Sequence, residues 1–251
     1  EWITQADRLG ELKVLEDAHW DLEIGVITEE VMRCHGPAIL FDRIAGFPPG
    51  YRILVNSLGS ENRLAMTLGL PKDLGTRGLL SLWSEQLRDL KPIPPKYVED
   101  GPVLENTYFD DDVDLFKFPT PKWHEHDGGR FIGTGSVDIT SDPDDGWVNL
   151  GCYRVMIHDK NKVGFYISPG KHGRIHRDKW FERDEPMPVV VSIGHDPAIF
   201  LAGGTDIPYG LPEYDWVGGL KGEPVEVIRG PVTGLPIPAT AEIVIEGYVD
   251  P

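Results

Sequence analysis

The stretch "NLGCYRVMIHDKNKVGFYISPGKHGRIHRDKW", residues 149–180, predicts both a local fold and a candidate site. The runs "NLGCYRVMI" and "VGFYIS" have the composition of strands, and "HDKNK" between them has the composition of a turn. If the two strands pair antiparallel, residues near the start of the first lie beside residues at the end of the second. The stretch therefore predicts a hairpin that brings Asn149 and Arg154 near Lys171 and His172.

The side chains on this predicted hairpin are suited to a metal and a phosphate. The Asn149 amide oxygen, the His172 imidazole and a later carboxylate form a mixed oxygen and nitrogen set that suits Mn²⁺ or Mg²⁺ better than zinc. Glu213 is the expected carboxylate, because it follows a segment rich in glycine and proline that can fold back. The backbone N–H groups of "SPGKHG" can bind a phosphate, with Lys171 as a point charge. The alternative is a basic strand pair that complements an acidic surface.

Outward from this stretch, the sequence predicts a mixed fold in two parts. Before residue 102, helical and strand patterns alternate, as in "DLEIGVITEEVMRC", "AILFDRI", "YRILVNSLG" and "TRGLLSLWSEQLRDL", which indicates an α/β layer. From residue 103, short strand-like runs separated by Gly, Pro and Asp turns indicate an antiparallel sandwich or barrel. One helical pattern, "GRIHRDKWFERD", interrupts these strands. We therefore expect domains at 1–102 and 103–251.

Composition narrows the class of protein. The 251 residues carry a formal net charge of −17 and no basic run, which argues against a general affinity for nucleic acid or anionic membranes. Two widely separated cysteines fit a reducing compartment, so we expect a cytoplasmic protein. No apolar stretch has the length of a membrane span. The chain starts without methionine and stops directly after a strand-like run, and we expect both ends to be cut.

Several motifs together resemble one family. "NLGCYRVMIHDKNKVGFYISPGKHG" is followed by "VVVSIGHDPA", "LPEYDWVGGLKGEPVEVIRG" and "GLPIPATAEIVIEGYVDP", and preceded by "GPAILFDRIAGFPPGYRILVNSLGS" and "WHEHDGGRFIGTG". In this order they resemble the UbiD family of reversible decarboxylases, which use prenylated flavin mononucleotide (prenylated FMN). The resemblance implies an α+β protein, with an N-terminal α/β domain followed by a flavin-reductase-like split β-barrel that binds the cofactor. It also implies that the family's C-terminal domain is absent from this chain, and that the barrel is incomplete at its end.

The resemblance also implies roles for individual residues. Asn149, His172 and Glu213 match the family's divalent metal ligands, for Mn²⁺ or Mg²⁺, and Arg154 matches the catalytic arginine that engages the substrate carboxylate. A planar guanidinium binds a carboxylate in a way that lysine does not reproduce. The residues that match the cofactor-enclosing segments are Asn149, Leu150, Gly151, Cys152, Tyr153, Arg154, Lys171, His172 and Glu213. A monovalent cation, K⁺, is expected beside Glu213 and the segment of Ala202, Gly203 and Thr205.

The implied activity is the reversible, non-oxidative decarboxylation of an aromatic, heteroaromatic or α,β-unsaturated carboxylic acid, with CO₂ as the small product. The cofactor supplies the electron sink, and the protein supplies orientation and charge. The expected partners are a flavin prenyltransferase that supplies the cofactor and, for the full-length protein, further copies in a homo-oligomer. Two other functions stay open: a non-catalytic flavin- or metal-binding subunit of a split decarboxylase complex, and a flavin reductase, for which no G-x-G-x-x-G fingerprint is present.

One departure from the family pattern is informative. A short acidic motif that supplies the catalytic acids is expected after the run "AEIVIEGYVDP", and this chain stops at Pro251. Glu242 and Glu246 lie on the preceding strand, where they are expected to be structural. We therefore expect the catalytic acids beyond residue 251, and these residues alone to be inactive.

Four other features have simpler explanations. His124 and His126 lie two apart, which on a strand places both rings on one face, as in some zinc sites, but a hydrogen-bonded polar edge is the commoner arrangement. His158–Asp159 and His195–Asp196 have the pattern of turn and capping residues. Cys152 has the character of a small buried apolar residue.

Overall fold

The computed structural model describes residues 1–251, and the chain divides into two units. The first unit contains residues 1–84, 108–132 and 155–164, and the second contains residues 85–107, 133–154 and 165–251. The helix α4 (Gly75–Asp89) runs across the division at residue 84. No helix combines the length and the apolar character needed to cross a membrane.

The first unit is built on a three-stranded sheet in the order β1-β2-β3, with β1 and β2 parallel and β3 antiparallel to β2. Its strands and helices are α1 (Trp2–Arg8), β1 (Leu12–Glu16), α2 (Glu23–Arg33), β2 (Ala38–Asp42), β3 (Ile53–Val55) and α3 (Glu61–Thr67). Ile24 of α2 and Phe41 of β2 are completely buried and belong to one apolar cluster. The α/β layer expected from the sequence is thus present.

A second sheet, mostly of the first unit, has the order β5-β8-β9. Its strands are β5 (Phe131–Gly133), β8 (Val155–Asp159) and β9 (Lys162–Phe165). Three short 3₁₀ turns lie earlier in the chain, at Pro102–Leu104, Asp110–Asp112 and Leu115–Lys117.

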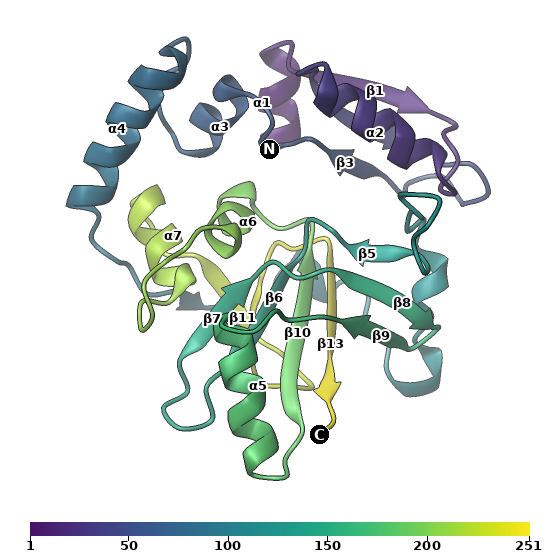
Figure 1. The fold of residues 1–251 in the computed structure, drawn as a ribbon, viewed down its shortest axis with the longest axis vertical. Coiled ribbons are helices and arrows are strands. Elements are labelled where there is room, and N and C mark those ends of the chain that lie inside the picture. The colour runs from purple at the N-terminus through teal and green to yellow at the C-terminus, as the bar shows by residue number, and fades with distance from the viewer. The chain divides into compact units, whose positions relative to one another are not determined.

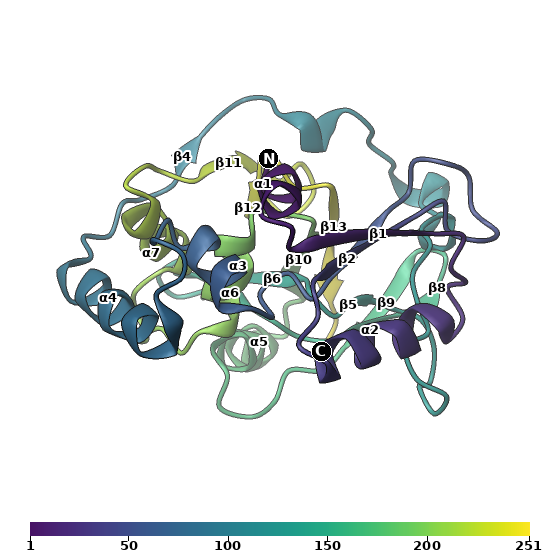
Figure 2. The ribbon, with the colours of Figure 1, turned by 90° about the horizontal axis from the view of Figure 1, so that it is seen from above.

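The second unit contains an antiparallel sheet in the order β13-β10-β6-β7. Its strands are β6 (Val137–Ser141), β7 (Val148–Gly151), β10 (Met187–Ile193) and β13 (Ile243–Val249). A smaller sheet in the order β12-β11-β4 consists of β4 (Lys96–Tyr97), β11 (Glu226–Arg229) and β12 (Pro236–Pro238), and β4 runs parallel beside β11 (Figure 2).

Three helices pack on the larger sheet of the second unit. They are α5 (His172–Glu182), α6 (Pro197–Gly204) and α7 (Glu213–Lys221). Helix α5 lies across β6, β7 and β10, while α6 and α7 lie side by side and contact β7 (Figure 1). All three helices therefore meet around the edge strand β7, which the sequence marks as the start of the candidate site.

The predicted hairpin is only partly correct. Strands β8 and β9 are neighbours joined by the turn at Lys160–Asn161, but Asn149 is not on either of them. It lies on β7, which pairs with β6 in a different sheet. The chain leaves regular structure at Cys152–Arg154 and changes sheets there. The sequence did not predict this break, because residues 149–157 have a continuous strand-like composition. Local composition carries no signal for a change of partner strand.

The strands do not form a closed barrel, since they are divided among four sheets with two edges each. The chain has the mixed α and β content expected from the sequence. Helices α6 and α7 were not expected, because both are buried and lack the amphipathic periodicity of a surface helix.

A polar face on β6 and β7 forms the candidate site

The pairing of β6 with β7 places unusual residues on one buried face. Thr140 is opposite Asn149 and Asp138 is opposite Gly151, so these four residues share one face of the sheet. Asp138, Thr140 and Asn149 are each at most 2% exposed. The opposite face carries Ile139 and Leu150, which are buried apolar residues. A strand pair in this position normally buries apolar side chains on both faces, so the polar face requires a specific reason.

Helix α5 covers this polar face with two histidines. His176 is fully buried, and its Nδ1 lies 3.0 Å from the Thr140 hydroxyl oxygen. Trp147, which precedes β7, packs edge-on against His172 and His176, at 5.1 Å between ring centroids in each case. Burial lowers the pKa of His176 to about 4, so its ring is neutral. His172, one turn earlier, has its pKa lowered by burial and by the charge of Lys171.

Four buried side-chain atoms around this face have no hydrogen-bond partner. They are Asp138 Oδ1, Trp147 Nε1, Asn149 Nδ2 and His176 Nε2. Only three other buried side-chain atoms of the chain lack a partner, at Arg63, Gln86 and Thr120. Because each unpaired buried polar atom costs free energy, such a concentration marks a place where further polar groups are bound.

Glu213 reaches this region from the start of α7. Its Oε2 accepts a hydrogen bond of 2.9 Å from the Leu150 N–H, on the edge of β7 that has no partner strand. Glu213 is 3% exposed, and burial raises its pKa to about 7 despite the N–H groups of Leu150 and of Glu213 itself. A cation beside this carboxylate would offset the cost of its burial.

The Tyr153 hydroxyl marks the point where three elements converge. The Asn149 side chain and the Gly173 N–H, in the first turn of α5, lower the pKa of Tyr153, and the Glu213 charge raises it. Burial is the main reason that the pKa of Tyr153 rises to about 12. A Cβ at Gly151 would lie 2.5 Å from the Tyr153 ring, and one at Gly173 would lie 2.8 Å from its hydroxyl oxygen. The two glycines therefore allow the tyrosine ring to lie against the backbone.

The predicted metal ligands thus gather by a route other than the predicted hairpin. Asn149 comes from β7, His172 from the start of α5 and Glu213 from the start of α7. An unpaired amide, a neutral imidazole and a buried carboxylate without a cation fit a divalent ion with oxygen and nitrogen ligands. No group of three or more His, Cys, Asp and Glu side chains in the chain is arranged to hold a metal, and the predicted set has only two such residues.

Arg154 is available to bind an anion. It is exposed and makes no hydrogen bond or ion pair in the structure, although acidic residues outnumber basic ones by 41 to 24 in this chain. It lies in the irregular segment Cys152–Arg154, next to Tyr153. A free guanidinium beside the polar face fits the predicted carboxylate-binding role.

The other predicted cofactor residues are distributed around β7 and α5. Leu150 and Gly151 are buried in β7, and Lys171, the residue before α5, is exposed and lies 3.6 Å from Asp206. The Cys152 thiol donates weakly to the Phe200 carbonyl oxygen at 3.7 Å, and burial raises its pKa to about 12. This thiol is therefore protonated and packed, as expected from its sequence context.

The predicted K⁺ segment forms the end of α6. Ala202 is buried, and its carbonyl oxygen accepts from the Thr205 N–H at 3.1 Å, while the Thr205 hydroxyl donates to Leu201. Gly203 packs near Cys152, since a Cβ there would lie 3.2 Å from the sulfur. A carbonyl oxygen has a second lone pair, so these groups keep some capacity for a cation.

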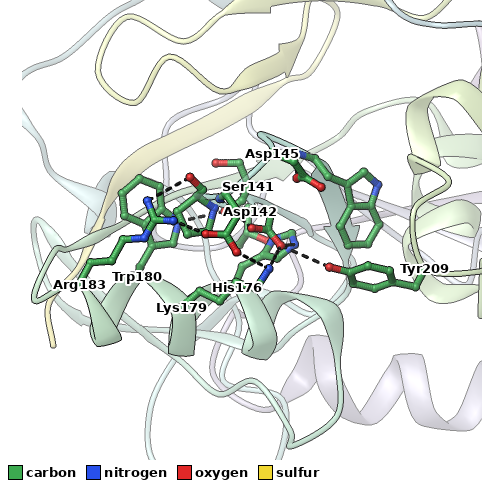
Figure 3. A network of polar contacts seen from close by, with 12 residues as sticks. Ser141, Asp142, Asp145, His176, Lys179, Trp180, Arg183 and Tyr209 are labelled. Atoms are coloured by element: carbon green, nitrogen blue, oxygen red, sulfur yellow. Dashed lines mark hydrogen bonds and ion pairs between the residues drawn. The ribbon is translucent and has the colours of Figure 1, made fainter.

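A network of charged groups continues from the polar face (Figure 3). Asp142 is buried and binds the Lys179 ammonium at 2.5 Å and the Tyr209 hydroxyl at 3.3 Å. Burial alone would raise the pKa of Asp142, but the Lys179 hydrogen bond and other partners lower it below its usual value. The Tyr209 ring packs on Trp147 and His172, with centroids 4.5 and 5.2 Å apart. The network holds the 206–211 loop beside His172.

A cavity elsewhere on the second unit does not contain the predicted site residues. It has a volume of about 340 Å³ and is lined by Pro95, Tyr97, Asp145, Gly146, Trp147, Val148, Pro212, Tyr214, Asp215 and Pro236. Trp147 is the one residue that it shares with the polar face. We base the site on the polar face, because the unpaired polar atoms and the free arginine are there.

The competing motifs have structural roles. His124 and His126 lie in a turn and not on a strand, so the expectation of a shared strand face is wrong, and the Asp127 carboxylate accepts from the His124 N–H. Asp159 accepts from the following N–H, and Asp196 caps α6 by accepting from Ala198 N–H at 2.9 Å. Glu246 accepts from the N–H and hydroxyl of Thr233, at 3.0 and 2.6 Å. Glu246 is thus structural, as expected.

Comparison with known proteins identifies the family. Residues 3–83 match the 3-octaprenyl-4-hydroxybenzoate carboxy-lyase N-terminal domain, and residues 96–251 match the Rift-related domain of the same carboxy-lyase. The chain belongs to the UbiD family, as its motifs suggested.

Individual relatives are decarboxylases. The chain is 38% identical over 246 residues to a pyrrole-2-carboxylic acid decarboxylase of Pseudomonas aeruginosa, which covers 94% of this chain and 49% of the relative. The closed form of vanillic acid decarboxylase from Sedimentibacter hydroxybenzoicus superposes with a TM-score of 0.92 and 26% identity, over 100% of this chain and 54% of that one. A third relative is an evolved dimeric form of the UbiD-class enzyme HmfF from Pelotomaculum thermopropionicum, in complex with prFMN. It superposes with a TM-score of 0.88 and 25% identity, over 100% of this chain and 56% of that one. The chain spans about half the length of the curated relatives that it matches.

Proposed function

We propose that this chain is the cofactor-binding part of a decarboxylase that uses prenylated FMN, a divalent metal and K⁺ to remove CO₂ from an aromatic, heteroaromatic or α,β-unsaturated carboxylic acid. The observation that carries the proposal is the buried polar face, where Asn149, the first turn of α5 and Glu213 converge around unpaired polar atoms. The similarity to a relative solved with prFMN and to named decarboxylases supports it.

Each residue of the face has a role in this proposal. Asn149, His172 and Glu213 hold Mn²⁺ or Mg²⁺, and the cofactor phosphate lies at the start of α5, where the helix dipole and the lack of a side-chain cap favour an anion. The carbonyl groups at Ala202, Gly203 and Thr205 supply the K⁺ site. When bound, the modified flavin supplies the electron sink for loss of CO₂. The sheets around β7 correspond, in this proposal, to part of a split β-barrel within 103–251.

Arg154 orients the substrate. Its exposed, unpaired guanidinium binds the carboxylate through two parallel hydrogen bonds and fixes the bond to be broken. Neither Glu246, which hydrogen-bonds the Thr233 loop, nor Glu242, which is exposed to solvent, is the proton donor in this proposal. We infer that the family's acidic motif supplies it.

The test is an absorbance spectrum and elemental analysis of the full-length protein, coexpressed with a flavin prenyltransferase. We expect a modified flavin and about one manganese per chain, consistent with one divalent site. Pyrrole-2-carboxylate and vanillate, the acids that name two of the relatives, then form the first substrate panel, with CO₂ release as the measurement. A colourless, metal-free protein would contradict the proposal and favour the non-catalytic subunit. NAD(P)H oxidation without CO₂ release would favour a flavin reductase.

A further inference from the structure

The segment that carries Arg154 receives no support from a β-ladder. Cys152, Tyr153 and Arg154 lie between β7 and β8, outside both strands. A buried backbone that leaves a sheet needs other partners for its N–H and C=O groups. The direction of the Arg154 side chain depends on how firmly the preceding residue is held.

Two buried side chains of the β6 region bind the main chain of Tyr153. Asp138 Oδ2 accepts from the Tyr153 N–H at 2.8 Å, and the Ser136 hydroxyl donates to the Tyr153 carbonyl oxygen at 3.4 Å. Asp138 is 0% exposed and Ser136 is 1% exposed. Asp138 and Ser136 therefore bind both the N–H and the C=O of Tyr153, the residue before Arg154.

Burying the Asp138 carboxyl group at this position costs free energy. It has no ion-pair partner, its Oδ1 has no hydrogen bond, and burial raises its pKa to about 8 although the hydrogen bond from the Tyr153 N–H opposes this rise. The strand neighbours Val137 and Ile139 are fully buried on the opposite face, so Asp138 belongs to a strand that is buried on both sides. A buried carboxyl group without a counter-ion indicates a specific task.

We propose that Asp138 is a positioning residue which, together with Ser136, fixes the main chain of Tyr153 and so aims Arg154 at the substrate carboxylate. The inference rests on the proposed function for the role of Arg154. The contact between Asp138 and the Tyr153 main chain does not depend on that function. The same contact also holds the Tyr153 ring against Gly151 and Gly173, beside Asn149.

Three variants of the full-length, flavin-loaded protein test the role. Asp138→Leu removes the acceptor and keeps the number and branching of the side-chain heavy atoms, whereas Asp138→Asn keeps an oxygen that can accept from the Tyr153 N–H. Ser136→Ala removes only a hydroxyl, and remains informative if Asp138→Leu does not fold. The matched control is Ile139→Val, a buried residue on the opposite face of the same strand, which perturbs packing without touching the contact.

The first readout is amide hydrogen exchange of the peptide that contains Tyr153. We expect faster exchange in Asp138→Leu and, to a smaller extent, in Ser136→Ala, with Asp138→Asn and Ile139→Val close to the parent. Unchanged exchange in Asp138→Leu would overturn the proposal, whether or not the protein is a decarboxylase.

The second readout is the affinity for the substrate-panel acid that the parent protein binds. Asp138→Leu should weaken carboxylate binding, and raise KM, by about tenfold or more at unchanged flavin occupancy, because a small displacement of an orienting group is costly. Asp138→Asn should restore both. If amide exchange at Tyr153 becomes faster but the affinity for the acid does not change, Asp138 does not orient Arg154. A flavin-loaded parent that binds no carboxylate would instead overturn the proposed function, and the aiming role with it.

Discussion

Asn149 shows at the scale of one residue how a buried amide can indicate a ligand. It is 2% exposed, its Nδ2 has no partner, and it lies on β7, which both α5 and α7 contact. A structural asparagine would normally have all its polar atoms paired. In the proposed function, His172 and Arg154 have distinct and separable roles.

His172→Ala should reduce retention of both manganese and flavin, because it removes a metal ligand at the start of α5. We expect metal affinity to fall at least about tenfold, as for the loss of groups around a metal site. Metal content and flavin absorbance of the purified full-length protein measure this. His126→Ala, in an exposed turn of the first unit, is the control and should retain both. Parent-like occupancy in His172→Ala would remove His172 from the site.

Arg154→Ala should leave flavin and metal occupancy unchanged and abolish carboxylate binding, since its guanidinium has no partner in the structure whose loss would disturb the fold. Arg154→Lys keeps the charge but not the planar fork, and should restore little of the affinity. Titration with the substrate acid and the flavin spectrum measure the two effects. Loss of flavin together with carboxylate binding would contradict the assigned role.

The burial of His195 predicts how the free energy of unfolding depends on pH. It is buried, its Nδ1 lies 3.0 Å from the Ser192 hydroxyl, and burial lowers its pKa to about 4, although Asp196 and Ser192 partly oppose this. Below the ordinary histidine pKa of about 6.5, the unfolded chain binds a proton that the folded chain does not. The contribution of His195 to the free energy of unfolding should therefore decrease as pH falls from about 6.5 to about 4, by up to about 1.4 kcal/mol per pH unit.

Urea unfolding of the parent and of His195→Asn at several pH values measures this contribution. The difference in unfolding free energy between the two proteins should shrink on acidification over that interval. A difference that stays constant from pH 7 to pH 4 would show that His195 titrates normally. Comparison of the two proteins cancels the opposite trend expected from the raised pKa values of Asp138 and Glu213.

At the scale of elements, the position of α7 decides where Glu213 lies. The helix packs its two glycines against the chain before β4: a Cβ at Gly218 would lie 2.3 Å from the Ile93 carbonyl oxygen, and one at Gly219 would lie 2.4 Å from that of Lys91. Both close atoms belong to the backbone, which cannot move aside as a side chain can. The glycine pair thus sets the distance between α7 and residues 91–93.

Gly218→Ala should destabilise the protein by about 1–3 kcal/mol, the usual cost of overpacking, and should also lower metal retention by displacing Glu213. Gly204→Ala at the end of α6 is the matched control, because a Cβ there meets nothing within 4 Å. Denaturant midpoints and metal content measure both effects. A Gly218→Ala protein as stable as the control would show that α7 is not held at this contact.

The elements also show why part of the site could not be predicted. α5 was expected from its sequence, and the Asp-Pro pair at 196–197 carries the signal of a helix start, with Asp196 as the cap and Pro197 in the first turn. The capping role expected for His195–Asp196 is confirmed at Asp196, but the helix that follows it was not expected. No comparable local signal marks Asp138 or His176 as buried, because their burial follows from α5 packing on β6, across more than 30 residues of chain.

At the scale of the whole molecule, the candidate site residues all belong to the second unit. A ligand that binds only the folded state protects the part that it binds. Loading the full-length protein with flavin and metal should therefore slow amide exchange most in residues 133–154 and 165–221. The flavin-free, metal-free protein under the same conditions is the reference. Protection mainly in residues 1–84 would place the cofactor elsewhere.

The sequence by itself determined the mixed fold, most of the strands and helices, and the residue types of the site. These features depend on local periodicity and on short motifs, which are written in consecutive residues. The tertiary structure alone decided that β7 pairs with β6 and not with β8, that α7 lies at the free edge of β7, and that Asp138 and Ser136 hold the residue before Arg154. These arrangements join residues far apart in the chain, and they are settled by which surfaces bury one another.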